Sequence, residues 1–168
     1  KQGVKGKYFH VSPHMTLTGT NADAWVSCKP GAEVKVALAL TRHVLHRANH
    51  LSSKELVAIK DHVKGYSLRG AALEAGLDYQ KIKLLAQALS KSRGKSVVIA
   101  GGNVNANENA TALQITVNLL NYVLGNVGKT LTFGEQLNIV GSQFNELEEI
   151  IQSMKNGEIE AVIINNVN

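Results

Sequence analysis

The stretch KSVVIAGG, Lys95–Gly102, decides the fold class. Its centre, Val97–Ala100, is a continuous run of apolar residues that two glycines end. Runs of this kind are typical of strands that are buried on both faces of a parallel sheet. A helical pattern follows from about Glu108 to Leu124, so the sequence predicts a strand, a turn and a helix in that order.

A second apolar run, EAVIINN at residues 160–166, follows an amphipathic pattern that we expect to be a helix, NELEEIIQSMKNG. Asn145 is the expected N-cap of this helix and Gly157 its expected end. Strands that alternate with helices across short turns are typical of βαβ units, whose parallel strands are joined by right-handed crossovers. We therefore predict an α/β fold, a three-layer αβα arrangement around a mostly parallel sheet.

The first third of the chain shows the same order of elements. Lys7–Ser12 predicts a strand, a polar loop runs to about Asp23, and AWVSCKPG, residues 24–31, predicts a second short strand. A helical pattern, residues 33–50, comes next.

Residues 52–94 predict a helical insertion within this α/β fold. SSKE, with Ser52 at its N-cap position, has the spacing of a capping box. Gly76 and Asp78 mark the end of a second helix and the N-cap of a third, which we expect Gly94 to stop.

The chain has 168 residues, of which 44% are apolar and 18% are charged, a composition typical of one globular domain. It begins without Met and stops within a predicted strand, so we expect residues 1–168 to be a single α/β domain excised from a larger chain. No apolar run approaches the ~18 residues of a membrane-spanning helix, so no direct membrane span is predicted.

The formal charge of +5 is divided unevenly along the chain. Residues 1–95 contain 16 Lys and Arg against 6 Asp and Glu, whereas residues 96–168 contain 2 against 7. A basic half attracts nucleic acid, phosphate groups or an acidic partner. Because few aromatic residues lie among the basic ones, a solvated face or a protein partner explains the charge better, and we predict no nucleic-acid partner.

LGNVGKT, Leu124–Thr130, resembles the end of a phosphate-binding loop, but two observations argue against one. The first glycine of that motif would fall at Val123. The segment also follows a helix and leads into TLTF, a predicted strand, which reverses the order that such a loop requires. Gly125 is instead the expected C-cap of the preceding helix, and Gly128 a turn residue.

The turn AGGNVNANE, residues 100–108, is the better candidate for ligand contact. In open α/β sheets ligands bind at the carboxyl ends of strands, where glycines let the backbone approach and the next helix presents free N–H groups. A plain turn between strand and helix is the more common role of such residues, and both interpretations are open. The candidate contacts for an anionic or polar ligand are Gly101, Gly102, Asn103 and Asn105.

Side chains with catalytic or metal-binding chemistry are few. His43, His46 and His50 lie on one side of a predicted helix, but no carboxylate joins them with zinc-site spacing and the neighbouring Arg residues disfavour a cation. Cys28 is the only cysteine, which excludes an intrachain disulfide or an all-cysteine iron–sulfur site in this segment, and we expect a buried structural thiol. We predict no catalytic residue and no metal site.

Three stretches match a known pattern in order. In residues 8–40 a strand and a loop precede ADAW, residues 22–25, and PGAE, residues 30–33; residues 96–129 form a strand, a glycine turn and a helix that ends in Gly-Asn-Val-Gly; and residues 154–168 end in a strand. This ordered set, which covers about two thirds of the chain and excludes the helical insertion, resembles the molybdopterin oxidoreductase family.

Within that family, TLTGTNAD, residues 16–23, together with LGNVGKT resembles the large iron–sulfur subunit of bacterial alternative complex III, a quinol oxidoreductase. The resemblance implies a molybdopterin-oxidoreductase-like region that has lost its molybdenum cofactor and is fused to an iron–sulfur region. Ser12-Pro13-His14 stands where cofactor-binding members have Asp-Pro-Arg, which puts dinucleotide binding in doubt. The vestigial cofactor contacts that we predict are Ser12, His14, Asp23, Gly101, Gly102, Asn103 and Asn105.

The resemblance implies a function in respiratory electron transport. The first interpretation is a non-catalytic scaffold in a membrane-associated complex at the periplasmic face of the bacterial inner membrane, with other subunits as partners and iron–sulfur clusters elsewhere in the parent chain. The alternative is a fragment of an active oxidoreductase of the polysulfide or thiosulfate reductase type, in which Asp23, Asn103 and the strand-end residues would hold a molybdopterin guanine dinucleotide. A third, unrelated interpretation is a nucleotide- or phosphate-binding module that uses Gly101 and Gly102.

Overall fold

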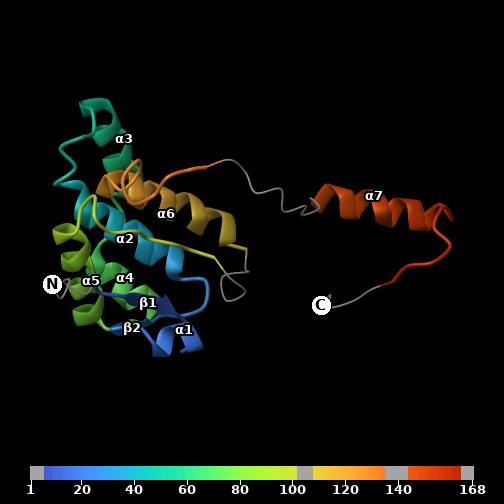
Figure 1. The fold of residues 1–168 in the computed structure, drawn as a ribbon, viewed down its shortest axis with the longest axis horizontal. Coiled ribbons are helices and arrows are strands. Elements are labelled where there is room, and N and C mark those ends of the chain that lie inside the picture. The colour runs from blue at the N-terminus through green and yellow to red at the C-terminus, as the bar shows by residue number, and fades with distance from the viewer. Residues whose placement is uncertain (1–5, 102–107, 135–143, 164–168) are drawn as a thin grey trace. The chain divides into compact units, whose positions relative to one another are not determined.

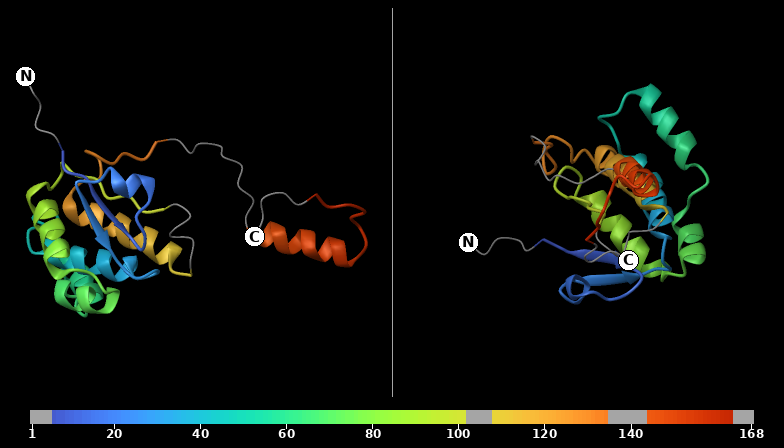
Figure 2. Two further views of the ribbon diagram at one scale, coloured as in Figure 1. Left: turned by 90° about the horizontal axis from the view of Figure 1, so that it is seen from below. Right: turned by 90° about the vertical axis from the view of Figure 1, so that its right-hand side faces the viewer.

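The computed structural model describes residues 6–101, 108–134 and 144–163. The chain divides into two units, Lys1–Thr132 and Phe133–Asn168, and each is described by itself. Figure 1 labels the helices and strands, and Figure 2 shows them from two further sides.

The sheet of the first unit consists of two parallel strands, β1 (Phe9–Ser12) and β2 (Ala24–Ser27). Phe9 pairs with Ala24 at one end and Ser12 with Ser27 at the other. Both strands were predicted, and their parallel pairing beside helices confirms the α/β class. The predicted polar loop between them contains one helical turn, α1 (Leu17–Thr20), which the Thr16 side chain caps.

Two long helices, α2 (Glu33–Leu45) and α6 (Ala110–Leu124), run side by side through the centre of the unit (Figures 1 and 2). Near their starts, the Asn109 amide nitrogen lies 3.6 Å from the position that a Cβ on Gly31 would take. Near their ends, the Arg93 guanidinium donates to the carbonyl oxygens of Val44, at 2.7 Å, and Val123, at 2.5 Å. The two helices therefore point in the same direction, and Arg93 joins their C-terminal ends.

Three further helices complete the first unit. They are α3 (Ser53–Val63), α4 (Leu68–Ala75) and α5 (Tyr79–Lys91), and all three were predicted. The capping box of Ser52 is present, Gly76 ends α4 in the left-handed conformation, and Asp78 caps α5. These helices lie within residues 52–94, but the status of that segment as an insertion stays a prediction.

The sequence predicted a strand over Val97–Ala100, and this prediction is wrong. The segment is extended, but it pairs with no other strand among the described residues. Instead, the side-chain amide of Asn121 accepts a bond from the Val98 N–H at 3.0 Å and donates to the Val98 carbonyl at 2.7 Å. A helix side chain thus takes the place of a neighbouring strand, while Val97 and Ile99 stay exposed.

The loop after α6 has the predicted turn chemistry. Gly125 ends the helix with φ of 69°, and Gly128 has φ of 75°, which is favourable only for glycine. The buried Asn126 amide donates to Asn121 and extends the polar network. The predicted strand TLTF does not form, because its described residues contribute only an isolated bridge between Val127 and Leu131.

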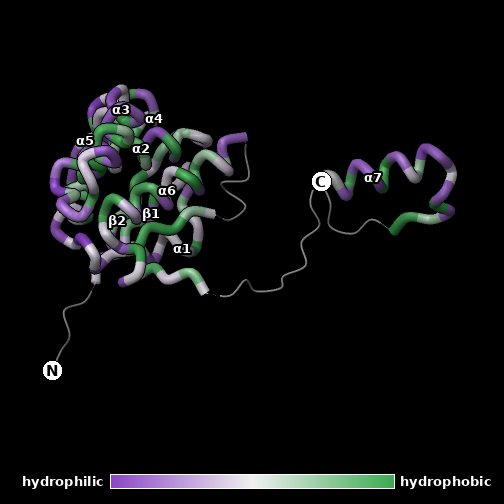
Figure 3. The backbone as a smooth tube through the Cα atoms, turned by 90° about the horizontal axis from the view of Figure 1, so that it is seen from above, coloured by the Kyte–Doolittle hydropathy of each residue, from purple (hydrophilic) through white to green (hydrophobic). Residues whose placement is uncertain are grey.

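The second unit contains one described helix, α7 (Phe144–Lys155). It begins one residue before the predicted cap, Asn145, and ends near Gly157 as predicted. Residues 160–163 form no strand, and the rest of the predicted strand lies outside the described residues. Figure 3 shows hydrophobic and hydrophilic residues alternating along α7.

Removal of the Asn121 amide should destabilise the first unit. Asn121→Ala leaves the Val98 N–H and carbonyl without partners in a half-buried position, so we expect a loss of about 2–4 kcal/mol in the free energy of unfolding. Urea unfolding followed by circular dichroism measures it. Asn118→Ala, at an exposed position of the same helix, is the control and should change stability by less than about 0.5 kcal/mol. Equal losses in the two variants would contradict this role.

The Glu55 carboxylate joins α3 to α6. It accepts bonds from the Ser52 hydroxyl and backbone N–H and from the Tyr122 hydroxyl. The bond from Ser52, followed by the bond from Tyr122, lowers the pKa of Glu55 from its ordinary 4.5 to about 2.

This pKa predicts an acid-dependent loss of stability. Because the folded pKa lies below the unfolded one, the stabilisation is complete above about pH 4.5 and disappears as the pH falls toward 2. We expect Glu55→Gln to be less stable than the wild type at neutral pH and to lose less stability between pH 4.5 and 2 in urea titrations. Glu148→Gln, on α7, is the control. Identical pH profiles for the wild type and Glu55→Gln would rule the interaction out.

Candidate functional site

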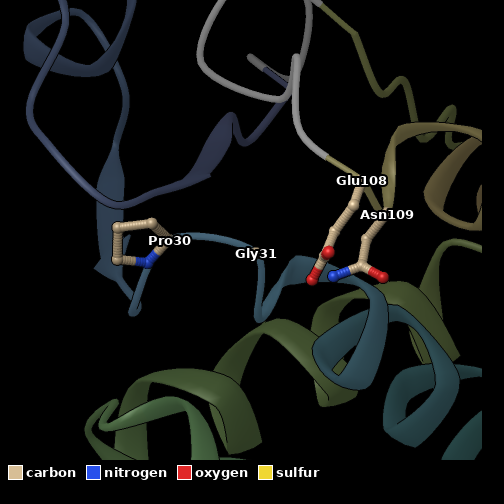
Figure 4. Close-up of a pocket in the computed structure, with 4 residues that line it drawn as sticks. All are labelled: Pro30, Gly31, Glu108 and Asn109. Atoms are coloured by element: carbon tan, nitrogen blue, oxygen red, sulfur yellow. The ribbon is translucent and has the colours of Figure 1, made fainter.

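The candidate site is an open pocket of about 430 Å³ lined by Pro30, Gly31, Glu108 and Asn109. Pro30 and Gly31 form the turn between β2 and α2, and the other two residues precede α6. Figure 4 shows the Glu108 and Asn109 side chains pointing toward the Gly31 turn. The pocket therefore lies where a strand ends and two parallel helices begin, the usual ligand position in α/β folds.

Helix geometry makes this end of the unit electropositive. The first turn of each helix carries about +0.5 of an elementary charge, and parallel neighbours place these partial charges together. Anions bind readily at such positions. Here the carboxylates of Glu33 and Glu108 already stand at the starts of α2 and α6. The protein's own side chains thus supply the negative charge that the helix ends favour.

Glu33 is the unusual member of this group because it is 5% exposed and its Oε1 atom has no hydrogen-bond partner among the described residues. The charge of Glu33 also affects the pKa of the Cys28 thiol. Burial, with a smaller contribution from the charge of Glu33, raises the pKa of Cys28 to about 12. Cys28 is 5% exposed, so the expectation of a buried thiol is confirmed.

Of the predicted contacts, Ser12 and His14 lie at the carboxyl end of β1. The Ser12 hydroxyl donates to the His14 carbonyl at 2.8 Å and accepts a bond from the Trp25 indole N–H at 3.0 Å. Its only donor is therefore engaged, and Ser12 is 3% exposed. The His14 side chain is exposed.

Asp23 lies at the other end of the sheet. It precedes β2, and its carboxylate accepts a bond from the Tyr8 N–H, just before β1, at 2.7 Å. Because the strands are parallel, this is their amino end, a strand length away from Ser12. The structure does not bring Asp23 together with the strand-end residues.

Gly101 ends the extended segment that runs beside α6. Its φ of 139° is open to glycine and strained for other residues, and the Gln114 amide approaches it while donating to the Ala100 carbonyl at 2.7 Å. Gly102, Asn103 and Asn105 lie outside the described residues.

The four residues that line the pocket were not predicted as one site. Glu33 was noted as a helix start and as part of the PGAE motif, Glu108 was included in the candidate turn but not among its contacts, and Asn109 was not singled out. One signal was present in the sequence, because each acidic residue follows a glycine-containing turn that comes after a strand-like segment. The sequence does not reveal that α2 and α6 begin beside each other.

The three histidines have partners within the chain. His43 and His46 pack edge to face at 5.8 Å, and the His50 ring bonds to the Tyr122 carbonyl at 2.9 Å. Within residues 6–101, 108–134 and 144–163 no three His, Cys, Asp or Glu side chains gather as metal ligands.

The raised pKa of Cys28 predicts an unreactive thiol. At pH 8 about 10⁻⁴ of a thiol with a pKa of about 12 is ionised, compared with about a tenth at the ordinary value of 9.0. We expect Ellman's reagent to label Cys28 slowly in the folded chain and rapidly in urea. Glu33→Gln should accelerate labelling of the folded chain, whereas the control, Glu108→Gln, should not. Equal rates in folded and unfolded protein would contradict the burial.

No protein-family profile matches the sequence. The chain is similar to the menaquinone reductase, molybdopterin-binding-like subunit of Nitratidesulfovibrio vulgaris, with 27% identity over 123 residues. These residues are 73% of the chain and 18% of the relative, so the chain spans less than a fifth of that protein's length. The similarity supports a relationship to molybdopterin-oxidoreductase-like proteins.

Proposed function

We propose that this chain is a molybdopterin-oxidoreductase-like domain of a respiratory quinol oxidoreductase complex. In this proposal it serves as a scaffold and partner surface and binds no molybdenum cofactor of its own. The observation that carries the proposal is the similarity, over 73% of the chain, to a subunit whose name describes it as molybdopterin-binding-like and part of a menaquinone reductase. The α/β fold with a pocket at the strand ends supports the same ancestry.

The chemistry of the pocket supports the loss of the cofactor. A guanine dinucleotide brings a pyrophosphate, which needs Lys, Arg or free N–H donors. The four lining residues include no Lys or Arg, and among them Glu108 places a carboxylate beside the start of α6. The donor of Ser12 is engaged within the chain. Among the described residues, the groups at this end of the sheet do not fit the anionic cofactor.

The wider assignments belong to the same proposal. Iron–sulfur clusters would lie elsewhere in a longer parent chain, other subunits would cover this domain, and the complex would lie at the periplasmic face of a bacterial inner membrane. Among the helices that the structure describes, none is long and apolar enough to cross a membrane.

Metal and pterin analysis of the full-length parent protein tests the proposal. We expect molybdenum by mass spectrometry and pterin by fluorescence after oxidation to be far below one per chain. A molybdopterin oxidoreductase that retains its cofactor, purified in the same way, is the control. Stoichiometric molybdenum with pterin would refute the scaffold and favour the alternative, a fragment of an active molybdopterin guanine dinucleotide enzyme.

The acidic pocket makes a second prediction, which the chain alone can test. Guanosine diphosphate at millimolar concentration should leave the melting temperature of the wild type unchanged, because Glu108, which lines the pocket, repels its phosphates. Glu108→Lys exchanges repulsion for attraction at the start of α6 and should produce a nucleotide-dependent rise. Glu146→Lys makes the same change of charge on α7 and is the control. A rise already present in the wild type would contradict the proposed loss of binding.

A further inference from the structure

The first unit carries a basic cluster that the proposed function does not use. We define it by five residues around the turn that follows α5: Arg47, Lys91, Arg93, Lys95 and Lys129. We propose that this basic cluster binds a carboxylate-rich surface of a partner protein. The inference does not rest on the proposed loss of the cofactor.

The members of the cluster come together from three parts of the chain. Lys91, Arg93 and Lys95 lie within five consecutive positions. The Lys129 ammonium approaches to 3.3 Å of the place that a Cβ on Gly94 would take, so it lies against the same turn. Burial, followed by the charge of Arg47, lowers the pKa of Arg93, which places Arg47 nearby.

The cluster residues form no ion pair within the part of the chain that the structure describes. The structure pairs Lys35 with Glu74 and Lys64 with Asp61. Arg93 is engaged with the carbonyl oxygens of Val44 and Val123. The other four members are exposed: Arg47, Lys91, Lys95 and Lys129.

The acidic side chains of the first unit have other roles. Asp23, Glu55 and Asp78 each accept a bond from a backbone N–H group, and Glu33 is buried. Carboxylates are thus used to cap helices and join loops, and few are left to neutralise Lys and Arg. This unit has an excess of positive charge, 17 Lys and Arg against 7 Asp and Glu in residues 1–132, and such an excess favours an acidic partner.

The composition of the cluster favours a protein over a nucleic acid. Proteins that bind single strands combine basic grooves with aromatic side chains on which bases stack. Aromatic residues are 5% of the chain, so few rings are available on which bases could stack. An acidic protein surface needs only complementary charge, which speeds association and selects the partner.

Binding of a fluorescein-labelled oligoglutamate peptide to the whole chain, measured by fluorescence anisotropy, tests the inference. We expect saturable binding that weakens as salt is added. A variant in which all four exposed members are exchanged for Glu (Arg47→Glu, Lys91→Glu, Lys95→Glu and Lys129→Glu) should bind the peptide at least about tenfold more weakly. In this variant four attractions between basic side chains and peptide carboxylates are replaced by repulsion. Arg93 is left unchanged because it joins the helix ends.

The matched control makes the same change of charge elsewhere. Lys7, Lys54, Lys60 and Lys83 are exposed and lie outside the cluster, and their exchange for Glu should weaken binding less than about threefold. Circular dichroism confirms that each variant is folded, and replacement by Gln serves if the Glu variants unfold. Equal weakening in both sets, no binding at all, or tighter binding of single-stranded oligo-dT than of the peptide would each overturn the proposal.

Discussion

The parallel direction of α2 and α6 determines which charged groups lie at the two ends of this helix pair. Antiparallel neighbours cancel the partial charges at their termini, but α2 and α6 place like ends together, so about one elementary charge gathers at each end. At the C-terminal ends the Arg93 guanidinium lies between two carbonyl oxygens. At the N-terminal ends Glu33 and Glu108 supply carboxylates. The pocket and the basic cluster thus lie at opposite ends of one helix pair.

Local features of the fold were predictable from the sequence because they depend on residues close together in the chain. The Ser52 capping box, the left-handed Gly76 and Gly125 and the Asp78 cap all occur as expected. The prediction for Val97–Ala100 was wrong for a physical reason. An apolar run becomes a strand only beside another strand, and here Asn121, more than twenty residues later, satisfies the backbone instead.

The candidate site was less predictable than the fold. Ser12 and His14 were placed correctly at a strand end, because that follows from the strand itself. Asp23 was grouped with them through the family resemblance, but the parallel register puts it at the other end of the sheet. Glu108 and Asn109 gain their significance only from the position of α6 beside the Gly31 turn, and no spacing along the sequence reveals a contact across such a distance.

The Asn121 amide serves only one edge of the extended segment, and this has a consequence for handling the protein. Val97 and Ile99 are 47% and 82% exposed, and no strand covers the opposite edge among the described residues. Apolar extended segments with an uncovered edge add to one another from molecule to molecule. We therefore expect this short segment to be the place where concentrated samples of the chain begin to associate.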